Sequence, residues 1–168
     1  GFRVQEFLLS NFRIVAVIES LVEKWFEDAR VTTAVTILQK EPDDAIRVAN
    51  RVRFLQLRKP LREIYGWKLK GPISEENEPA RQRDLTAVRD LIEEIGENEA
   101  NEYWRVRLVS QGELWKQGCE ARVRADEDED AAGRYKAGKW GQHLRAPDVY
   151  FDLLDRCGER LAPMYELA

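Results

Sequence analysis

Side chains of the types that enzymes use for acid–base or nucleophilic chemistry are few in this sequence. His143 is the only histidine, and the two cysteines, Cys119 and Cys157, form no C-x-x-C spacing and have no histidine cluster nearby. A general base needs an orienting partner, so a lone histidine is more often structural than catalytic. No Ser-His-Asp order, phosphate-binding loop or spacing of metal ligands occurs. We therefore expect neither a self-contained catalytic set nor a metal site.

The acidic run at 126–130 is the one group of side chains that could hold a hard cation. It lacks the glycine turn and the regular ligand spacing of a calcium-binding loop. Five adjacent carboxylates also repel one another, which favours an exposed, solvated loop. The run is therefore interpreted as a loop and not as a cation site.

Charge is distributed unevenly along the 168 residues, although the net charge is only −4. Residues 1–70 hold 13 Lys and Arg against 9 Asp and Glu, residues 71–133 hold 8 against 17, and residues 134–168 hold 6 against 5. The net charge does not indicate a nucleic-acid-binding protein. The distribution nevertheless divides the chain into a mildly basic, a strongly acidic and a nearly neutral segment.

The composition is that of a soluble protein, with 35% charged and 43% hydrophobic residues. No apolar run approaches the ~20 residues that a membrane-spanning helix needs, so we expect no membrane partner. The start of the sequence has no signal-peptide pattern, and two cysteines outside any motif suit a reducing cytoplasm. The sequence begins at Gly1 without an initiator methionine, which is typical of a fragment or a processed chain.

Two runs rich in β-branched residues, 14–18 and 31–38, flank a loop that carries Trp25 and Phe26. The first run is continuously apolar, which is typical of a strand buried on both faces. Such strands are normally covered by helices on both sides of the sheet. The sequence therefore predicts an α/β fold with this loop at the end of the sheet.

Two later segments, 50–57 and 103–109, alternate polar and apolar residues, with arginines among the polar ones. This pattern predicts two strands that pair antiparallel, the first of them half-exposed. The clearest helix is 80–95, because its apolar residues recur at i, i+3 and i+4. Another helix begins at 146–148 and ends at Gly158, and its apolar face comprises Val149, Tyr150, Leu153 and Leu154. Shorter helical segments are expected at 3–11, 45–49 and 61–66.

Two blocks of the sequence resemble the adenine-specific N6 DNA methyltransferases of restriction–modification and phage-defence systems. The first block is Asn11-Phe12-Arg13-Ile14-Val15-Ala16-Val17-Ile18-Glu19 together with Trp25 to Leu38, and the second is Trp140-Gly141-Gln142-His143-Leu144-Arg145-Ala146-Pro147-Asp148-Val149-Tyr150-Phe151. The resemblance implies the late strands of a Rossmann-like methyltransferase sheet, with flanking helices and an additional antiparallel strand pair. It also implies that 1–70 is the C-terminal part of a catalytic domain, 71–133 an acidic helical insert with a strand, and 134–168 a connector into a target-recognition domain.

Two hallmarks of that family are missing from this sequence. The glycine-rich motif that binds S-adenosylmethionine is absent, and so is the Asn-Pro-Pro-Tyr/Phe tetrapeptide that contacts the target amine. The family often has Asn-Thr where this chain has Thr32-Thr33, which is a small departure. The resemblance therefore implies a fragment of an S-adenosylmethionine-dependent enzyme, without catalytic or cofactor-binding residues and inactive by itself. Its partners would be the remaining methyltransferase and target-recognition segments and, through the full-length enzyme, double-stranded DNA.

One residue matches a functional position of that family. Phe26 corresponds to an aromatic side chain that stacks on the adenine flipped out of the duplex, and stacking restores part of the few kcal/mol that flipping costs. The alternative is that Phe26, or its neighbour Trp25, packs against the sheet.

Two groups of basic residues could contact DNA phosphates, which requires cations gathered on one surface. The better candidates are interleaved with Tyr135 and Trp140 and comprise Arg134, Lys136, Lys139 and Arg145. The other group comprises Arg51, Arg53, Arg58 and Lys59, and a solvated strand face is the favoured interpretation for these four.

Two other hypotheses remain open at this point. The chain could be a non-catalytic α/β interaction or scaffold domain that kept the fold and lost the chemistry, or an unrelated α/β domain. The unrelated domain would be favoured if 14–18 and 31–38 were not neighbouring strands.

Overall fold

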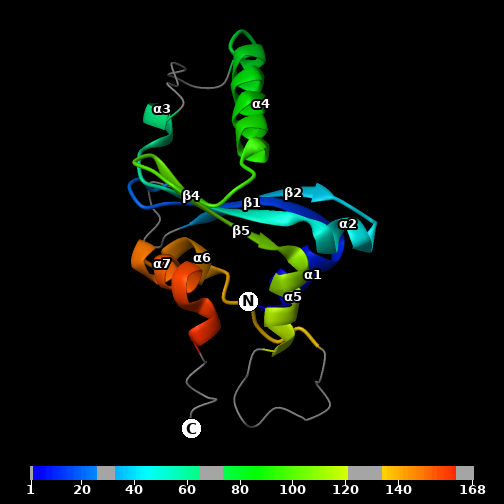
Figure 1. Cartoon of the computed structure of the whole chain (residues 1–168). Coiled ribbons are helices and arrows are strands. Elements are labelled where there is room, and N and C mark those ends of the chain that lie inside the picture. Colours follow the sequence, from blue (N-terminus) through cyan, green and yellow to red (C-terminus); the bar gives the residue numbers. More distant parts are fainter. Residues whose placement is uncertain (1, 26–32, 65–73, 121–133, 162–168) are drawn as a thin grey trace.

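The computed structural model describes residues 2–25, 33–64, 74–120 and 134–161 (Figure 1). In chain order the elements are α1 (Phe2–Asn11), β1 (Phe12–Ser20), β2 (Ala34–Lys40), α2 (Asp44–Ala49), β3 (Arg51–Leu57), α3 (Leu61–Ile64), α4 (Glu78–Glu94), β4 (Glu99–Ala100), β5 (Trp104–Ser110), α5 (Gln111–Glu120), α6 (Gly141–Arg145), α7 (Asp148–Cys157) and the 3₁₀ helix η2 (Gly158–Arg160). No helix among these is long and apolar enough to cross a membrane.

The strands form a five-stranded open sheet in the order β2-β1-β3-β5-β4, with helices flanking it. β1 and β3 run parallel, and every other neighbouring pair is antiparallel. The predicted α/β class is therefore confirmed. The expected adjacency of the first two runs is also confirmed, since Ile18 lies opposite Val35. So is the antiparallel pairing of the two arginine-containing strands, where Phe54 lies opposite Arg107.

β1 is buried on both faces, as its apolar run predicts. The register between β1 and β2 shifts between Ile14 and Ala16, so one extra residue is accommodated there. As a result Ile14 and Val17 pack on one face of the sheet, while Ala16 and Ile18 pack on the other. β1 thereby contributes side chains to two separate hydrophobic cores.

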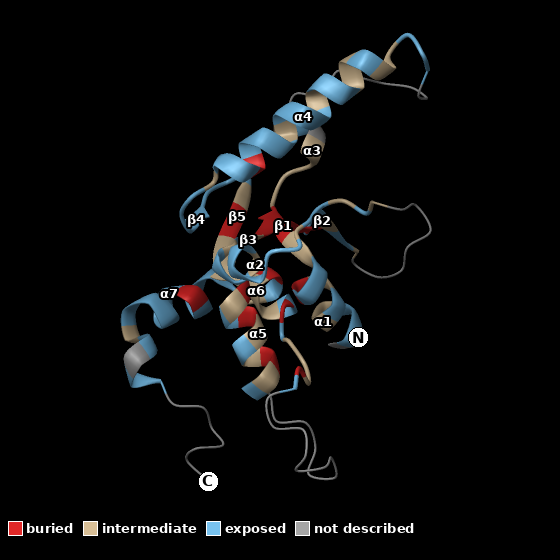
Figure 2. Cartoon of the chain, turned by 90° about the vertical axis from the view of Figure 1, so that its right-hand side faces the viewer, coloured by how far each residue is buried: buried red, intermediate tan, exposed pale blue. Residues whose placement is uncertain are grey.

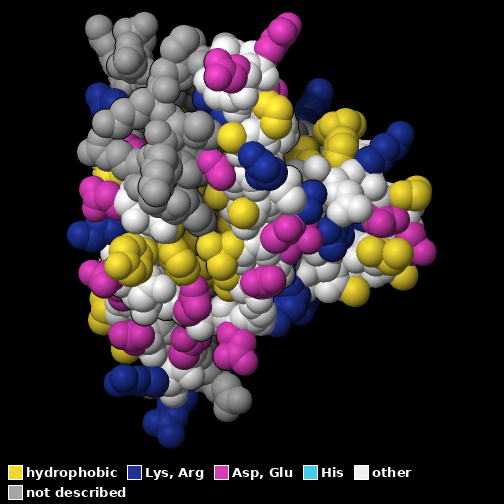
Figure 3. Space-filling model, turned by 90° about the horizontal axis from the view of Figure 1, so that it is seen from above, with side chains coloured by type: hydrophobic (Ala, Val, Ile, Leu, Met, Phe, Trp, Pro, Cys, Tyr) yellow, Lys and Arg dark blue, Asp and Glu magenta, His cyan; other side chains and the backbone are white. Residues whose placement is uncertain are grey.

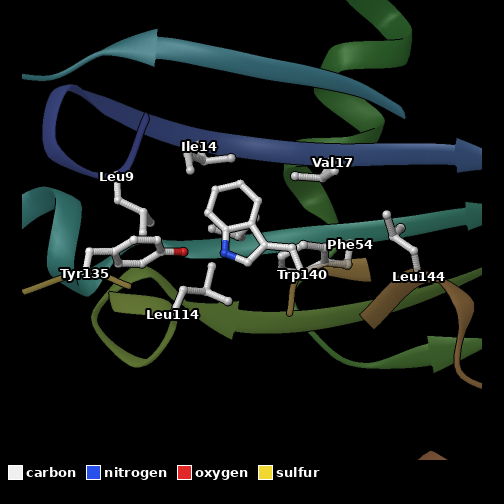
Figure 4. Close-up of a cluster of buried hydrophobic side chains, with 9 residues drawn as sticks. Leu9, Ile14, Val17, Phe54, Leu114, Tyr135, Trp140 and Leu144 are labelled. Carbon is white, nitrogen blue, oxygen red and sulfur yellow. The ribbon is translucent and has the colours of Figure 1, made fainter. Parts of the chain in front are cut away.

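Helices cover both faces of the sheet (Figures 1 and 2). On one face, the C-terminal end of α4 and the short α3 pack on the α4-side core, which comprises Ala16, Ile18, Leu55, Leu57, Ile92 and Val106. On the other face, α1, α5 and α6 enclose the α6-side core, which comprises Leu9, Ile14, Val17, Val52, Phe54, Leu114, Tyr135, Trp140 and Leu144 (Figure 4).

β3 differs from its prediction as a half-exposed strand. Val52 and Phe54 are fully buried on the α6 side, and Leu55 and Leu57 are buried on the α4 side. The alternation of residues along β3 correctly predicts which side chains share a face of the sheet. Both faces of β3 are nevertheless covered, because β3 is the central strand of the sheet. Arg53, which the alternation places on a solvent face, lies beneath the end of α4.

The predicted helices are present, but their apolar faces are covered only in part. In α4 only Ile92 is buried, while Leu85 and Leu91 remain 48% and 37% exposed. In α7 the buried residue is Phe151, and the predicted apolar face is exposed. Contacts other than this apolar face therefore hold α7 on the sheet, namely ion pairs and the Phe151 ring.

Candidate functional site

The parallel strands β1 and β3 end side by side, with Ser20 opposite Leu57. In open α/β sheets, ligands bind in the crevice outside the carboxyl ends of parallel strands. The segment that leaves this edge after β1 carries Trp25 and Phe26. Phe26 lies outside the described residues, while Trp25 is partly buried against the α4-side core. Packing on the sheet is therefore the role of Trp25.

Three buried polar side chains form a row across the sheet just before this edge. Glu19 of β1 lies opposite Gln56 of β3, which lies opposite Arg105 of β5. Their exposed fractions are 2%, 5% and 3%, respectively. Buried polar groups need hydrogen-bond partners, and residues of α6 and of the start of α7 provide them for this row.

The C-terminal end of α6 supplies these partners because a proline follows it. Ala146 is extended, as expected for a residue that precedes proline, and the helix ends there. The carbonyl oxygen of Leu144 accepts hydrogen bonds from the side chains of Gln56 and Arg105. Nε of Arg145 donates to both carboxylate oxygens of Glu19, at 2.9 and 3.1 Å.

Asp148 at the start of α7 joins two arginines. Arg105 Nη1 donates to its Oδ1 at 2.7 Å, and Arg58 Nη2 donates to both of its oxygens at 2.6 Å. These hydrogen bonds, that of Arg105 first, lower the pKa of the Asp148 carboxyl. The carboxylate is therefore held in its charged form between two cations.

Ion pairs and one aromatic ring attach the rest of α7 to β5. Arg107 donates to both oxygens of Asp155, at 3.0 and 2.9 Å, and this bonding lowers the pKa of Asp155. The guanidinium carbons of Arg105 and Arg107 lie 4.7 and 4.6 Å from the centre of the Phe151 ring, close enough for cation–π attraction. These contacts explain why α7 turns its acidic residues and Phe151 toward the sheet.

The predicted DNA-contacting residues are divided between two places. Arg134 and Lys139 are exposed and Lys136 is half-buried on the segment before α6, whereas Arg145 lies in the polar cluster at the strand ends. Tyr135 and Trp140 are 4% and 8% exposed and point into the α6-side core (Figure 4), so no aromatic surface lies between these cations.

Tyr135 and its neighbours fasten this segment to α1 and α5. The Tyr135 hydroxyl donates to Oε1 of Gln5, which also accepts the backbone N–H of Gly138. The Tyr135 ring covers Gly118 so closely that a Cβ there would lie 2.1 Å from a ring carbon. Burial raises the pKa of Tyr135 to about 12. The aromatic residues of this segment are therefore structural.

Two of the four arginines and lysines of the other basic group bind the end of α4. Arg51 Nη1 donates to the carbonyl of Gly96, and Arg53 Nε donates to that of Ile95, both at 2.9 Å. Cations near a helix C-terminus satisfy its free carbonyls and interact favourably with its dipole. Arg51 is exposed, as expected for a solvated strand face, whereas Arg53 is half-buried beneath the end of α4 and departs from that interpretation. Arg58 binds Asp148, and Lys59 is partly buried.

The face that carries α4 has no surface of a single charge sign. Lys and Arg alternate with Asp and Glu over the part of this face that is not covered by grey atoms (Figure 3). DNA backbones attract surfaces of uniform positive charge. The described part of this face therefore offers no uniformly positive surface.

His143 fits the structural role expected of a lone histidine. Its ring lies 4.7 Å from that of Phe54, and burial, with a smaller contribution from Arg107, lowers its pKa to about 4. Within the described residues its hydrogen-bond contact is with the Gln142 side chain, at 3.4 Å, and no carboxylate orients it there. Among the described residues no group of three His, Cys, Asp or Glu could hold a metal ion, and the run 126–130 lies outside them.

Because the pKa of His143 is lowered, we expect the protein to lose stability in mild acid. The folded-state pKa of this histidine, about 4, lies below the ordinary value of 6.5, so its contribution to stability is complete above pH 6.5 and is lost as the pH falls toward 4. We expect the urea midpoint to decline over that window, and to decline less in His143→Gln. Equal declines in the two proteins would show that other groups cause the acid sensitivity.

Comparison with protein-family models found no match, and no curated protein or solved structure matches the chain significantly.

Proposed function

We propose that this chain is a segment of an S-adenosylmethionine-dependent DNA adenine N6-methyltransferase of a restriction–modification or phage-defence system. It would extend from the C-terminal part of the catalytic domain to the start of the target-recognition domain. The observation that carries this proposal is the contact between the two resembling blocks. Glu19 of the first block is buried against Arg145 of the second, although 126 positions separate them. Two blocks chosen for their sequence alone thus build one site.

The position of this site suits an enzyme that acts on a flipped base. The segment with Phe26 leaves the carboxyl end of β1, beside the Glu19–Arg145 pair. An aromatic side chain at such an edge can stack on a base that has left the duplex, while nearby cations bind the backbone. Stacking by Phe26 is accordingly part of the proposal.

The polar row of Glu19, Gln56 and Arg105 does not fit S-adenosylmethionine. An acidic residue at the end of a strand commonly binds ribose hydroxyls in Rossmann-like folds, but Glu19 is 2% exposed and paired with Arg145. Gln56 and Arg105 in the same row are occupied by Leu144 and Asp148. In the proposed enzyme, other segments would have to supply the glycine-rich motif and bind the cofactor.

The alternative function is a non-catalytic interaction domain, and the outer face of α7 favours it. Val149 and Leu153 are 61% and 52% exposed on a helix that is attached by its acidic side. An exposed apolar helix face is typical of protein–protein contact. In the methyltransferase proposal the same face would contact the target-recognition domain.

Cofactor binding and methylation by the full-length polypeptide separate these possibilities, and calorimetric titration of the chain with S-adenosylmethionine tests the missing-motif argument. The 168-residue chain should give no binding heat, because it lacks the cofactor motif. The full-length polypeptide should bind the cofactor and transfer labelled methyl groups to adenine in duplex DNA. Cofactor binding by the chain alone would contradict the missing-motif argument, and a full-length polypeptide without Asn-Pro-Pro-Tyr/Phe or methylation would favour the interaction domain.

A further inference from the structure

The guanidinium of Arg145 is held from one side only. Its Nε binds both oxygens of Glu19, whereas no hydrogen bond joins Nη1 or Nη2 to another described residue. The Arg145 side chain is 61% exposed and the Glu19 side chain 2% exposed. One edge of the fork is therefore fixed to the sheet and the other faces solvent.

Glu19 is itself held firmly. It lies within β1, opposite Gln56, in the part of the strand that is paired on both sides. An arginine that is already ordered loses less side-chain entropy when it binds a ligand. Burial of Glu19 in a paired strand thus makes Arg145 a preorganised binding group.

The surrounding charges leave Arg145 available to an anion. Three arginines and two carboxylates meet at the strand ends, and Asp148 is bonded to both Arg58 and Arg105. Glu19 balances the charge of Arg145, so the one cation in excess belongs to the two arginines that share Asp148. Nη1 and Nη2 of Arg145 are the donors of this cluster that lie on an exposed side chain. Two parallel N–H groups on a guanidinium match two oxygens of a phosphate, and such bidentate pairs are among the strongest charge-assisted hydrogen bonds.

We propose that Arg145 binds a phosphodiester group of DNA through Nη1 and Nη2, and that Glu19 is the positioning residue for this contact. This inference rests on the proposed function, because it identifies the backbone of the DNA substrate as the ligand of the same site. The terminal amino groups of this exposed side chain are the donors that remain for a ligand once Nε is bound to Glu19. Glu19 thereby increases DNA binding although it carries a negative charge.

The variant Glu19→Gln distinguishes positioning from simple electrostatics. It raises the net charge of the chain by one, so electrostatic attraction alone predicts tighter DNA binding. Positioning by Glu19 predicts weaker binding, by roughly 3- to 10-fold, because the guanidinium loses its anchor. The number of phosphate contacts is unchanged, so the slope of log K against log salt should stay the same.

The test measures binding of the 168-residue chain to a fluorescein-labelled 20-base-pair duplex by fluorescence anisotropy. Binding is measured between 50 and 200 mM NaCl, because the slope of log K against log salt changes by about one unit for each phosphate contact. Arg145→Lys keeps the charge but lacks Nε and the fork, and it should weaken binding by roughly 5-fold. Arg89→Lys is the matched control, because Arg89 lies on α4 and pairs only with its exposed neighbour Asp90 within the described residues. Circular dichroism verifies that each variant is folded.

Each outcome decides the inference. Weaker binding by both Glu19→Gln and Arg145→Lys, with Arg89→Lys unchanged, supports it. Binding that is unchanged or tighter in Glu19→Gln overturns it and leaves the proposed function intact. A wild-type chain that does not bind DNA overturns it as well, and methylation by the full-length polypeptide then decides the proposed function separately.

Discussion

Arg145→Ala is expected to lower the unfolding free energy by about 3 kcal/mol, although the Arg145 side chain is 61% exposed. The cost arises at its partner, since removing the arginine leaves the carboxylate of Glu19 buried without a cation. Loss of one member of a fully buried ion pair typically costs about 3–5 kcal/mol, and this pair is buried only on the Glu19 side. We expect the lower end of that range because water can reach the space that Arg145 vacates. Urea denaturation measures the change.

A double-mutant cycle identifies the cause of this loss. Glu19→Gln in the Arg145→Ala background removes the unpaired charge and should restore more than half of the lost stability. Arg89→Ala, which breaks an exposed pair on α4, should change stability by less than about 0.5 kcal/mol. If Glu19→Gln gives no recovery, the effect of Arg145→Ala comes from lost packing and not from a buried charge.

Hydrophobic patterns predict the sheet well because they report which residues must be covered. The continuous run of β1 indicates burial on both faces, and the alternation in β3 and β5 correctly predicts a strand pair. A hydrophobic pattern does not show which other elements cover a strand, and the pattern of β3 therefore predicts a half-exposed strand. Arg53 illustrates the limit, since its long side chain crosses the covered face to reach the carbonyl of Ile95.

The candidate site is only partly predictable, because its members are far apart in sequence. Glu19, Gln56 and Arg105 come together through strand register, and no local spacing indicates that they share a row. A charged residue that ends a buried strand, such as Glu19, is the one available signal. The orientation of α7 is equally hidden, because Asp148 and Asp155 pair with arginines on β5.

Aromatic residues near lysines and arginines do not by themselves indicate an aromatic binding surface. Tyr135 and Trp140 alternate with cations in the sequence, as in a nucleic-acid-binding surface. In the structure the same alternation places the rings in the core and leaves Arg134 and Lys139 exposed. An amphipathic segment on a core produces this pattern without any ligand.

Under the proposed function, Phe26→Ala in the full-length polypeptide is expected to lower the methylation rate by roughly 5- to 150-fold with little change in melting temperature. An aromatic ring that stacks on an extruded base contributes about 1–3 kcal/mol, which corresponds to that range of rates. The measurement is transfer of labelled methyl groups to duplex DNA, normalised to folded protein. Phe26→Tyr keeps a stacking face and should retain most of the activity.

Trp25→Ala provides the matched control, because Trp25 is the neighbouring aromatic residue and packs on the α4-side core. Truncation of a partly buried tryptophan should lower the melting temperature while the rate per folded molecule stays near that of the wild type. The two substitutions therefore separate a base-stacking role from a packing role at adjacent positions. If Phe26→Ala instead lowers the melting temperature strongly and leaves the rate per folded molecule unchanged, Phe26 packs on the protein, and the proposed base contact at this edge is wrong.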